Sequence, residues 1–307
     1  MKKVSVVIPV YNEGQVLERL FHRLIPVMEG LGRDYEIVMV DDGSTDNSLD
    51  ILVQHAGKGI KVVELTRNYG QHAAVFAGFK SSTGEIIITM DADLQNPPEE
   101  IPRIVKLMDQ GGHEVVGTIR KQRKDSQFRK VASRIINAVT RRITGVRLRD
   151  WGCMLRGYSR PVVENMVNSE EYSTFIPALA TSFAKDVIEI EVGHEDRSAG
   201  QSKYSLTKLI SLQFDLVTAF SDFPLKFMLY LGFLMALFGI SFGVILLFAR
   251  FYFGAQWAVQ GVFTLFAILF FLVGTQFLAL GVMGEYVGRI YRQVKKRPSY
   301  VVRKIHS

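Results

Sequence analysis

Short apolar runs alternate with amphipathic segments along the first part of the chain. Five of these runs have the length and the β-branched composition of buried strands. They cover Lys3–Val10, Tyr35–Val40, Lys61–Leu65, Glu85–Met90 and Glu114–Thr118. The segments between them have helical spacing or small-residue composition, and they cover Glu13–Leu31, a stretch capped by Ser44 or Thr45, a stretch that ends near Gly78, and Pro98–Met108. Strands that alternate with helices predict parallel βαβ units and a doubly wound, mostly parallel sheet of the α/β class.

Two apolar stretches near the end of the chain, residues 225–249 and 257–281, are each long enough to span a bilayer. Lys226 and Arg250 flank the first stretch. A cluster of basic residues follows the second, namely Arg289, Arg292, Lys295, Lys296 and Arg297. Basic residues gather on the cytoplasmic side of membrane proteins. The pattern therefore predicts a two-helix membrane anchor, with both ends of the chain on the cytoplasmic side.

A strongly basic segment lies between the predicted sheet and the anchor. From Arg120 to Arg149 the chain carries eleven Lys and Arg residues and one acid, Asp125, a net charge of +10 against +7 for all 307 residues. Within it, Gln127–Thr144 has an apolar stripe and cations on its other faces, as an interfacial membrane helix requires. An ordinary helix packed on the sheet has the same pattern. Leu206–Phe220 is a second apolar-faced helix. No base-reading or aromatic-rich motif accompanies the cations, so we expect no nucleic-acid partner.

The remaining composition adds two points. The chain has one cysteine, Cys153, which excludes an internal disulfide, and we interpret it as a small buried residue. Lys2 and Lys3 precede an apolar run, but Tyr11-Asn12-Glu13 follows that run in place of a small-residue cleavage site. We therefore interpret the run as a first strand and not as a signal peptide.

Two carboxylates, Asp91 and Asp93, come directly after the fourth predicted strand and before Pro97 and Pro98. In open α/β sheets, ligands bind outside the carboxyl ends of the strands. A hard divalent cation prefers carboxylate oxygens and usually bridges to substrate phosphates. For an isolated Asp-x-Asp, a solvated turn at a strand end is the alternative. The residues at the other strand ends help to decide between a cation site and a solvated turn.

Polar residues also follow the first three predicted strands. They are Tyr11-Asn12-Glu13, Asp41-Asp42 and Arg67-Asn68. In a doubly wound sheet these ends and Asp91-Ala92-Asp93 line one crevice, and a nucleotide with a metal on its diphosphate fits such a crevice. No Gly-x-Gly-x-x-Gly follows the first strand and the chain has no Walker loop, which argues against dinucleotide or P-loop chemistry.

Three motifs together resemble the inverting family 2 glycosyltransferases, which have the GT-A fold. They are Val7-Ile8-Pro9-Val10-Tyr11-Asn12-Glu13, Asp41-Asp42-Gly43-Ser44-Thr45-Asp46 and Asp91-Ala92-Asp93-Leu94-Gln95. The two predicted spans resemble the polyprenyl-phosphate branch of that family. Four further stretches resemble the enzymes that transfer 4-deoxy-4-formamido-L-arabinose to undecaprenyl phosphate, namely Arg67–His72, Asn96–Pro102, Gly152–Arg156 and Ser202–Tyr204.

The resemblance implies a set of site residues. Nucleotide-sugar binding would involve Pro9, Tyr11, Glu13, Asp41, Asp42, Asn68, Gln71, Asp91, Ala92 and Gln95. Asp91 and Asp93 would hold Mg²⁺ or Mn²⁺ against the diphosphate, and we expect Asp93 to be the direct ligand. Catalysis would involve Asp93, Asp150, Arg197 and Lys203, with Arg197 and Lys203 in a loop that closes over the phosphates.

A lipid-phosphate acceptor changes the expectation for Asp150, which stands where related enzymes place a catalytic carboxylate. The second ionisation of such a phosphate lies near pH 6, by analogy with phosphorylated side chains. The acceptor is therefore already a nucleophile at neutral pH. We expect Asp150 to orient the sugar or a cation and not to abstract a proton.

The resemblance implies transfer of 4-deoxy-4-formamido-L-arabinose from UDP to undecaprenyl phosphate, at the cytoplasmic face of a bacterial inner membrane, for lipid A modification. It also implies a homo-oligomer, a tetramer in related enzymes. Transfer of glucose, mannose or another hexose to a polyprenyl phosphate is the alternative within this class. A membrane-anchored nucleotide-binding scaffold without turnover and a channel or transporter are the alternatives outside it. The expected parts are a nucleotide-sugar-binding GT-A core at 1–125, an acceptor-side part at 126–222, the anchor at 223–288 and a basic cytoplasmic tail at 289–307.

Overall fold

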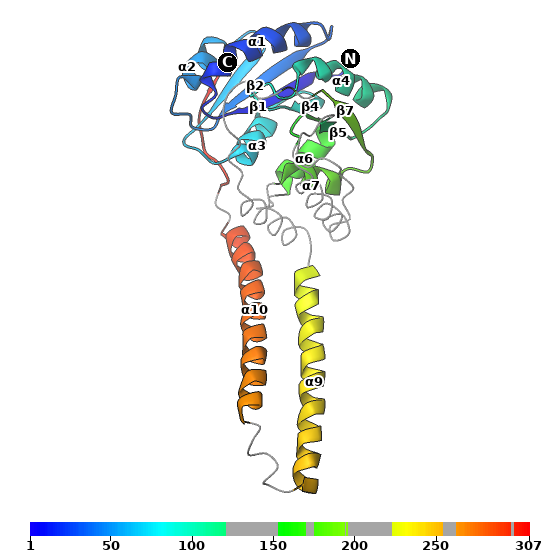
Figure 1. Ribbon diagram of the computed structural model, residues 1–307. Helices are drawn as coiled ribbons and strands as arrows, with labels where there is room; N and C mark the ends of the chain where they lie inside the picture. Colours follow the sequence, from blue (N-terminus) through cyan, green and yellow to red (C-terminus); the bar gives the residue numbers. More distant parts are fainter. Residues whose placement is uncertain (121–152, 170–174, 194, 196–222, 254–261, 296–297) are drawn as a thin grey trace. The chain divides into compact units, whose positions relative to one another are not determined.

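The computed structural model of the chain describes residues 1–120, 153–169, 175–193, 195, 223–253, 262–295 and 298–307. The chain divides into two compact units, Met1–Ser205 with Arg297–Ser307, and Leu206–Lys296. The first unit is an α/β structure and the second contains two long helices (Figure 1). The predicted helices at Gln127–Thr144 and Leu206–Phe220 lie outside the described residues.

An eight-stranded sheet forms the centre of the first unit, in the order β7-β5-β6-β4-β1-β2-β3-β8. The strands are β1 (Val4–Val10), β2 (Tyr35–Asp41), β3 (Ile60–Leu65), β4 (Ile86–Thr89), β5 (Val115–Arg120), β6 (Arg156–Ser159), β7 (Val187–Val192) and β8 (Val302–His306). β1 pairs in parallel with β2 and with β4, and β2 pairs in parallel with β3. The five predicted strands and the α/β class are confirmed, and the carboxyl ends of β1 to β4 lie at one edge.

Two strands run against the direction of their neighbours, so the sheet is mixed. β6 lies between β4 and β5 and is antiparallel to both, and β8 is antiparallel to β3. The hydrophobic pattern predicts neither strand. β6 has only four residues, and β8 carries Arg303, Lys304 and His306 among its five.

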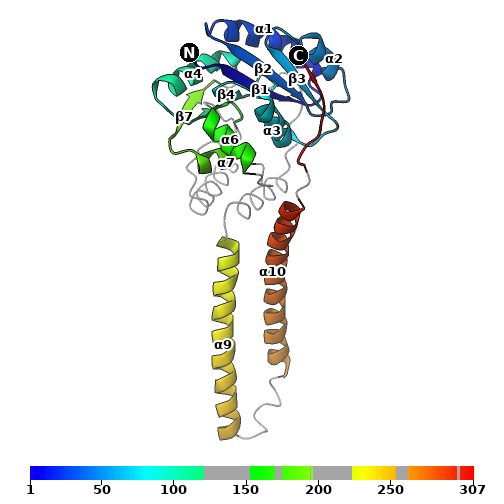
Figure 2. The ribbon, with the colours of Figure 1, turned by 180° about the vertical axis from the view of Figure 1, so that it is seen from behind.

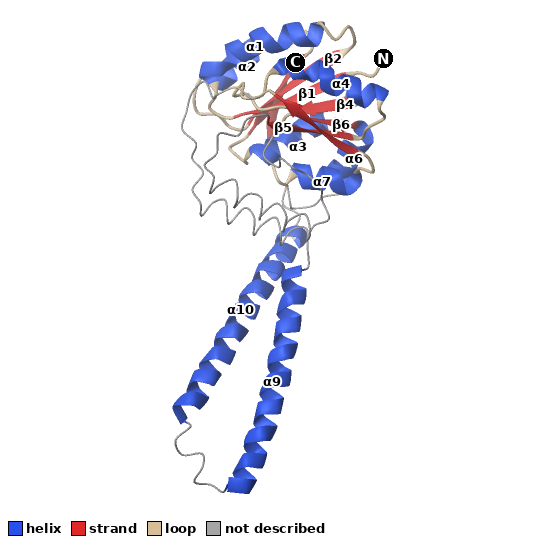
Figure 3. Cartoon of the chain, turned by 45° about the vertical axis from the view of Figure 1, so that its right-hand side comes forward, coloured by secondary structure: helices blue, strands red, loops and turns tan. Residues whose placement is uncertain are grey.

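Helices cover both faces of the sheet. α1 (Gly14–Glu29), α2 (Ser48–Gln54) and α4 (Ile101–Gln110) lie on one face, and α3 (Gln71–Ser81), α6 (Arg160–Asn168) and α7 (Ile176–Phe183) lie on the other (Figures 2 and 3). Alternate residues of a strand point to opposite faces. On β1, Val6 and Ile8 belong to the core cluster that contains Leu20 of α1. Val7 faces α3, where a Cβ on Gly78 would lie 2.2 Å from Val7 Cγ1. The close approach of α3 to the sheet therefore requires Gly78.

One predicted helix start is wrong, and a second differs in helix type. Asn47, and not Ser44 or Thr45, is the N-cap residue of α2. Ser44 instead belongs to the preceding turn, where its backbone N–H donates to the Asp41 carboxylate. The stretch that begins at Pro98 starts as a 3₁₀ turn, η1 (Pro98–Glu100), before α4 follows.

The last residues of the chain belong to the sheet. Thr66 N donates to Val301 O at 3.0 Å where β3 ends. The buried carboxylate of Glu64 on β3 lies 3.0 Å from Arg303 Nη1 and 3.2 Å from His306 Nε2. The expected basic tail thus ends in a strand that brings Arg303 and His306 to a buried acid.

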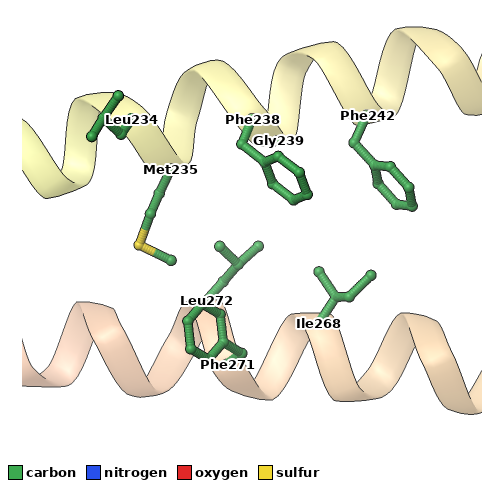
Figure 4. A pocket seen from close by; sticks show the side chains of 8 residues that line it. All are labelled: Leu234, Met235, Phe238, Gly239, Phe242, Ile268, Phe271 and Leu272. Carbon is green, nitrogen blue, oxygen red and sulfur yellow. The ribbon is translucent and has the colours of Figure 1, made fainter.

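The second unit contains α9 (Phe223–Phe253) and α10 (Val262–Val294). Two segments of these helices, Phe223–Phe253 and Ile268–Gly288, are long and apolar enough to cross a membrane, with hydropathies of 2.5 and 1.7. A groove of ≈ 450 Å³ lies between the helices. Figure 4 shows Met235 and Phe238 pointing toward α10, and Leu272 pointing toward α9. Both predicted apolar stretches fall on these helices, apart from residues 257–261, which lie outside the described residues.

Candidate functional site

The carboxyl ends of β1, β2, β3 and β4 lie next to one another, as the sequence predicts. Val10 pairs with Asp41 across β1 and β2, and Asp41 pairs with Glu64 across β2 and β3. On the other side of β1, Met90 N donates to Val7 O at 3.1 Å. The turns that follow the four strands therefore share the sheet edge at which ligands bind in open α/β folds.

Asp41 ends β2 and Asp42 begins the turn that follows, and they are only 1% and 2% exposed. The Asp41 carboxylate accepts a hydrogen bond from Ser44 N. Asp42 accepts two, from Tyr69 N at 2.7 Å and from Gly70 N at 2.9 Å. Burial raises the pKa of both carboxyls, and these N–H donors oppose the rise. Asp42 therefore holds the loop after β3, a role that the sequence does not reveal.

Gly43 allows the turn after β2 to approach that loop. Its φ is +69°, and a Cβ there would lie 2.5 Å from the carbonyl carbon of Arg67. The loop has further contacts of its own. Thr66 Oγ1 and Tyr69 Oη lie 2.8 Å apart, and the Arg67 guanidinium carbon stands 4.9 Å from the centre of the Tyr69 ring.

The same loop reaches the acidic turn after β4. Gln71 is the first residue of α3, and its Nε2 donates to Asp91 Oδ1 at 2.6 Å. Tyr69 and Gly70 bind Asp42, and the next residue binds Asp91. Residues 69–71 therefore join the two acidic turns, and they bring together three of the predicted site residues.

The acidic turn after β4 has a strained backbone. Leu94 is buried with φ = 61°, a left-handed conformation that costs about 1–2 kcal/mol for a residue with a side chain. Asp93 Oδ1 accepts a hydrogen bond from Gln95 N at 3.1 Å, which closes the turn. Ala92 is buried, whereas Asp91 and Asp93 are partly exposed. The turn thus keeps its apolar residues inside and its carboxylates at the surface of the site.

The donor set of this turn suits a hard divalent cation, because carboxylate oxygens are the ligands that Mg²⁺ and Mn²⁺ prefer. Within the described part of the chain, no group of three or more His, Cys, Asp and Glu side chains is placed to hold a metal ion. A cation held by Asp91 and Asp93 would complete its coordination with water and ligand oxygens, as Mg²⁺ usually does.

The turn after β1 is held against the Asp41 turn. Asn12 has φ = 55°, its backbone N–H donates to Ser44 Oγ at 3.1 Å, and its Oδ1 accepts from Thr45 N at 2.8 Å. The remaining predicted binding residues lie at this edge. Pro9 is near the end of β1 and is partly buried, as are Glu13 and Gln95 in the turns, whereas Tyr11 and Asn68 are exposed.

Three predicted catalytic residues, Asp150, Arg197 and Lys203, lie outside the described residues. The described residues nearest to them in sequence lie against the acidic turn. Cys153 Sγ donates to the buried Asn96 Oδ1 at 3.4 Å, and Glu195 N donates to Gln95 O at 2.9 Å. The sequence predicts no role for Asn96, since nothing in its residue type distinguishes it from a turn residue.

A partly buried histidine lies next to the site. His72 is the second residue of α3, and its ring meets that of Phe175 edge-on at 5.7 Å. Burial lowers the pKa of His72 to about 4, so the ring is neutral at physiological pH. The sequence gives no signal that separates this packed histidine from one that binds a ligand.

Comparison with known proteins gives matches to a family and to solved structures. The model of "Glycosyl transferase family 2" matches residues 5–166, more than half of the chain. Crystal structures of glucosyl-3-phosphoglycerate synthase from Mycobacterium tuberculosis have a similar fold. Its complex with phosphoglyceric acid is 19% identical, with a TM-score of 0.50 over 71% of this chain and 79% of that chain. Its complex with Mn²⁺, UDP-glucose and phosphoglyceric acid is 19% identical, with a TM-score of 0.50 over 71% and 78%.

Proposed function

Because the chain belongs to glycosyl transferase family 2, we propose that it transfers a sugar from UDP to a polyprenyl phosphate with inversion at the anomeric carbon. The specific proposal is 4-deoxy-4-formamido-L-arabinose as the sugar and undecaprenyl phosphate as the acceptor, for lipid A modification. The observation that carries the nucleotide-sugar part is the joining of the two acidic turns by residues 69–71. A synthase of similar fold, crystallised with Mn²⁺ and UDP-glucose, supports the donor class.

Each acidic turn suits one end of a UDP-sugar. Asp42 and the exposed Tyr11 are proposed to contact the base and ribose. Both oxygens of Asp42 already accept backbone N–H groups, so the nucleoside would use the remaining lone pairs of the carboxylate. Asp91 and Asp93 would hold Mg²⁺ or Mn²⁺, which when bound neutralises the charge that develops on the leaving diphosphate. We propose Asp93 as the direct ligand, and Asp91, which accepts a hydrogen bond from Gln71, as a ligand through a water molecule.

The chemistry proposed is a single displacement. An oxygen of the lipid phosphate forms a bond to the anomeric carbon while the bond from that carbon to UDP breaks, and the product is a phosphodiester-linked sugar lipid. Arg197 would bind the diphosphate through two parallel hydrogen bonds from its guanidinium, and Lys203 would attract it as a single positive charge. Asp150 would orient the sugar or a cation, since the acceptor phosphate is already ionised.

The membrane part of the proposal is supported by α9 and α10 and by the basic residues near them. We propose that both helices cross the bacterial inner membrane, with the catalytic unit on the cytoplasmic side. The basic segment before the anchor would hold the site close to anionic headgroups. The chain is proposed to form a homo-oligomer, a tetramer as in related enzymes, and mass measurement of the detergent-solubilised protein tests this state.

Turnover by the full-length protein in detergent micelles with Mn²⁺ tests the proposed reaction. The expected result is release of UDP that requires undecaprenyl phosphate, and preference for UDP-4-deoxy-4-formamido-L-arabinose over UDP-glucose in direct competition. A preference for UDP-glucose would instead support the hexosyltransferase alternative. Nucleotide binding without UDP release in the presence of lipid phosphate would support the scaffold alternative.

A further inference from the structure

One guanidinium group binds two carboxylates from distant parts of the first unit. Arg23 lies on α1, Glu99 in η1, and Glu195 just beyond β7. Arg23 Nε and Nη2 donate to the two oxygens of Glu99 at 3.0 and 2.8 Å. Arg23 Nη1 and Nη2 donate to the two oxygens of Glu195 at 3.0 and 2.9 Å. Each carboxylate is therefore held by two hydrogen bonds, the geometry in which arginine binds most specifically.

The positive charge of Arg23 offsets the repulsion between the two neighbouring carboxylates. The hydrogen bonds from Arg23 lower the pKa of both Glu99 and Glu195, whereas the charge of Glu99 acts to raise the pKa of Glu195. The side chain of Arg23 is 22% exposed, against 52% for Glu99 and 45% for Glu195. The cation is thus the most enclosed of the three groups, and without it two like charges would face each other.

The two segments that Arg23 joins also meet through the backbone. Glu195 N donates to Gln95 O at 2.9 Å, and Gly193 N donates to Glu100 Oε1 at 3.2 Å. Gln95 ends the acidic turn that begins at Asp91. The segment that leaves β7 is therefore fastened to η1 at Gly193 and to the acidic turn at Glu195.

We propose that Arg23 is a positioning residue that fixes the segment after β7 against the acidic turn. In this way it strengthens the binding of the donor diphosphate at the site. The inference rests on the proposed function, because the backbone N–H of Glu195 donates to Gln95 O in the turn that carries Asp91 and Asp93, the proposed metal ligands beside the diphosphate. Arg23 acts through Glu99 and Glu195 and does not contact the reacting atoms. Its loss weakens the binding of UDP and UDP-sugar more than it slows the chemical step.

Four single variants of the full-length protein and one double variant, Arg23→Gln with Glu195→Gln, test this role. Arg23→Gln removes the cation, Arg23→Lys keeps the charge but loses the fork, and Glu195→Gln removes one partner. Arg33→Gln is the matched control, because it breaks another ion pair of an arginine, to Asp109 at 2.6 Å, away from the acidic turn. The measurements are the Kd of UDP with Mn²⁺ by calorimetry, the KM and kcat for the donor, and the thermal unfolding midpoint.

We expect Arg23→Gln to raise the Kd of UDP and the KM of the donor about tenfold, with kcat changed less than about threefold, as the loss of a binding contribution predicts. Arg23→Lys should recover part of the loss, and Arg23→Gln with Glu195→Gln should be no worse than Arg23→Gln alone, since both changes break one linkage. Arg33→Gln should leave the Kd and KM unchanged even where it lowers the unfolding midpoint.

An unchanged Kd of UDP in Arg23→Gln, or an equal rise in Arg33→Gln, would overturn the inference. The first result means that Arg23 does not act on the site, and the second means that any loss of stability has the same effect. The proposed function fails separately, if the wild-type protein binds UDP but transfers no sugar. The Kd comparison still tests Arg23 in that case, because it requires no turnover.

Discussion

Gln71 Nε2 donates a hydrogen bond to Asp91 Oδ1 at 2.6 Å, from the residue directly after the two whose N–H groups bind Asp42. One short loop thus sets the orientation of a buried carboxylate on one side and of a partly exposed carboxylate on the other. Groups that orient a metal ligand through a hydrogen bond affect metal binding nearly as much as the ligand does.

Replacing Gln71 by Leu should therefore weaken metal activation. We expect the Mn²⁺ concentration for half-maximal UDP release to rise about tenfold or more, because Asp91 loses the donor that orients it. Gln110→Leu, at the exposed end of α4, is the control for loss of a surface amide. An unchanged Mn²⁺ dependence with a higher donor KM would show that Gln71 contacts the sugar and does not orient Asp91.

Substitution of two glycines distinguishes the effect of backbone strain from the effect of displacing the loop after β3. Gly32→Ala and Gly43→Ala both place a side chain at positive φ, at +61° and +69°, which costs about 1–2 kcal/mol. A Cβ on Gly32 meets no described atom within 4 Å, whereas one on Gly43 meets the backbone of Arg67, which adds about 1–3 kcal/mol. Thermal unfolding should show the larger loss for Gly43→Ala, and that variant alone should bind UDP more weakly. Equal UDP affinity in both variants would contradict the role given to the loop.

The buried carboxylate of Glu36 should make stability depend on pH in the acid range. Burial raises its pKa, but hydrogen bonds from Ser5 and Thr83 and the charge of Lys3 outweigh burial and lower it from 4.5 to about 2. The lowered pKa stabilises the fold above pH 4.5, and this contribution of about 3 kcal/mol is lost as pH falls toward 2. Unfolding midpoints between pH 5 and pH 3 should therefore fall less in Glu36→Gln than in wild type. An exposed control, Glu85→Gln, should follow the wild-type curve.

The C-terminal strand should stabilise the sheet through Glu64. The Glu64 side chain is 9% exposed and that of Arg303 is 62% exposed, so Arg303→Ala leaves an enclosed carboxylate with less compensation. We expect a loss of about 1–3 kcal/mol in unfolding free energy. Glu64→Gln in the same chain should recover part of it, because the amide carries no charge. A chain ending at Tyr300 should lose more, since it also uncovers the edge of β3. Additive losses in the double variant would show that the two side chains act independently.

Asp150 is proposed to orient a substrate and not to act as a base. Asp150→Asn should lower kcat while the acidic limb of the pH–rate profile, which belongs to the lipid phosphate near pH 6, stays in place. The measurement is kcat/KM for the lipid acceptor between pH 5 and pH 9 at saturating donor. Loss of that limb in the variant would identify a protein group and contradict the proposal.

Local pattern was sufficient for the strands that place the site. A parallel strand covered on both faces is mostly apolar. β1, β2 and β4 each contain three or more apolar residues in succession, whereas β3 is interrupted by Lys61 and Glu64. Because β2 and β4 are parallel, the acids at their carboxyl ends are predicted to lie at the same edge of the sheet. The two apolar segments of α9 and α10 are equally visible, because length and composition alone make them candidates to span a membrane.

The remaining features depend on which segments the chain brings together. β8 pairs with β3 only because the end of the chain returns to the sheet. A short polar segment has no hydrophobic pattern from which its partner strand could be predicted. The contacts of Arg23 with Glu99 and Glu195, and of Gln71 with Asp91, join residues that are far apart in sequence. A side chain's residue type states which hydrogen bonds it is able to make, whereas its actual partner is selected by tertiary packing. The sequence by itself thus determined the fold class and the acidic ends of the strands, and only the tertiary structure decided how those ends are held to one another.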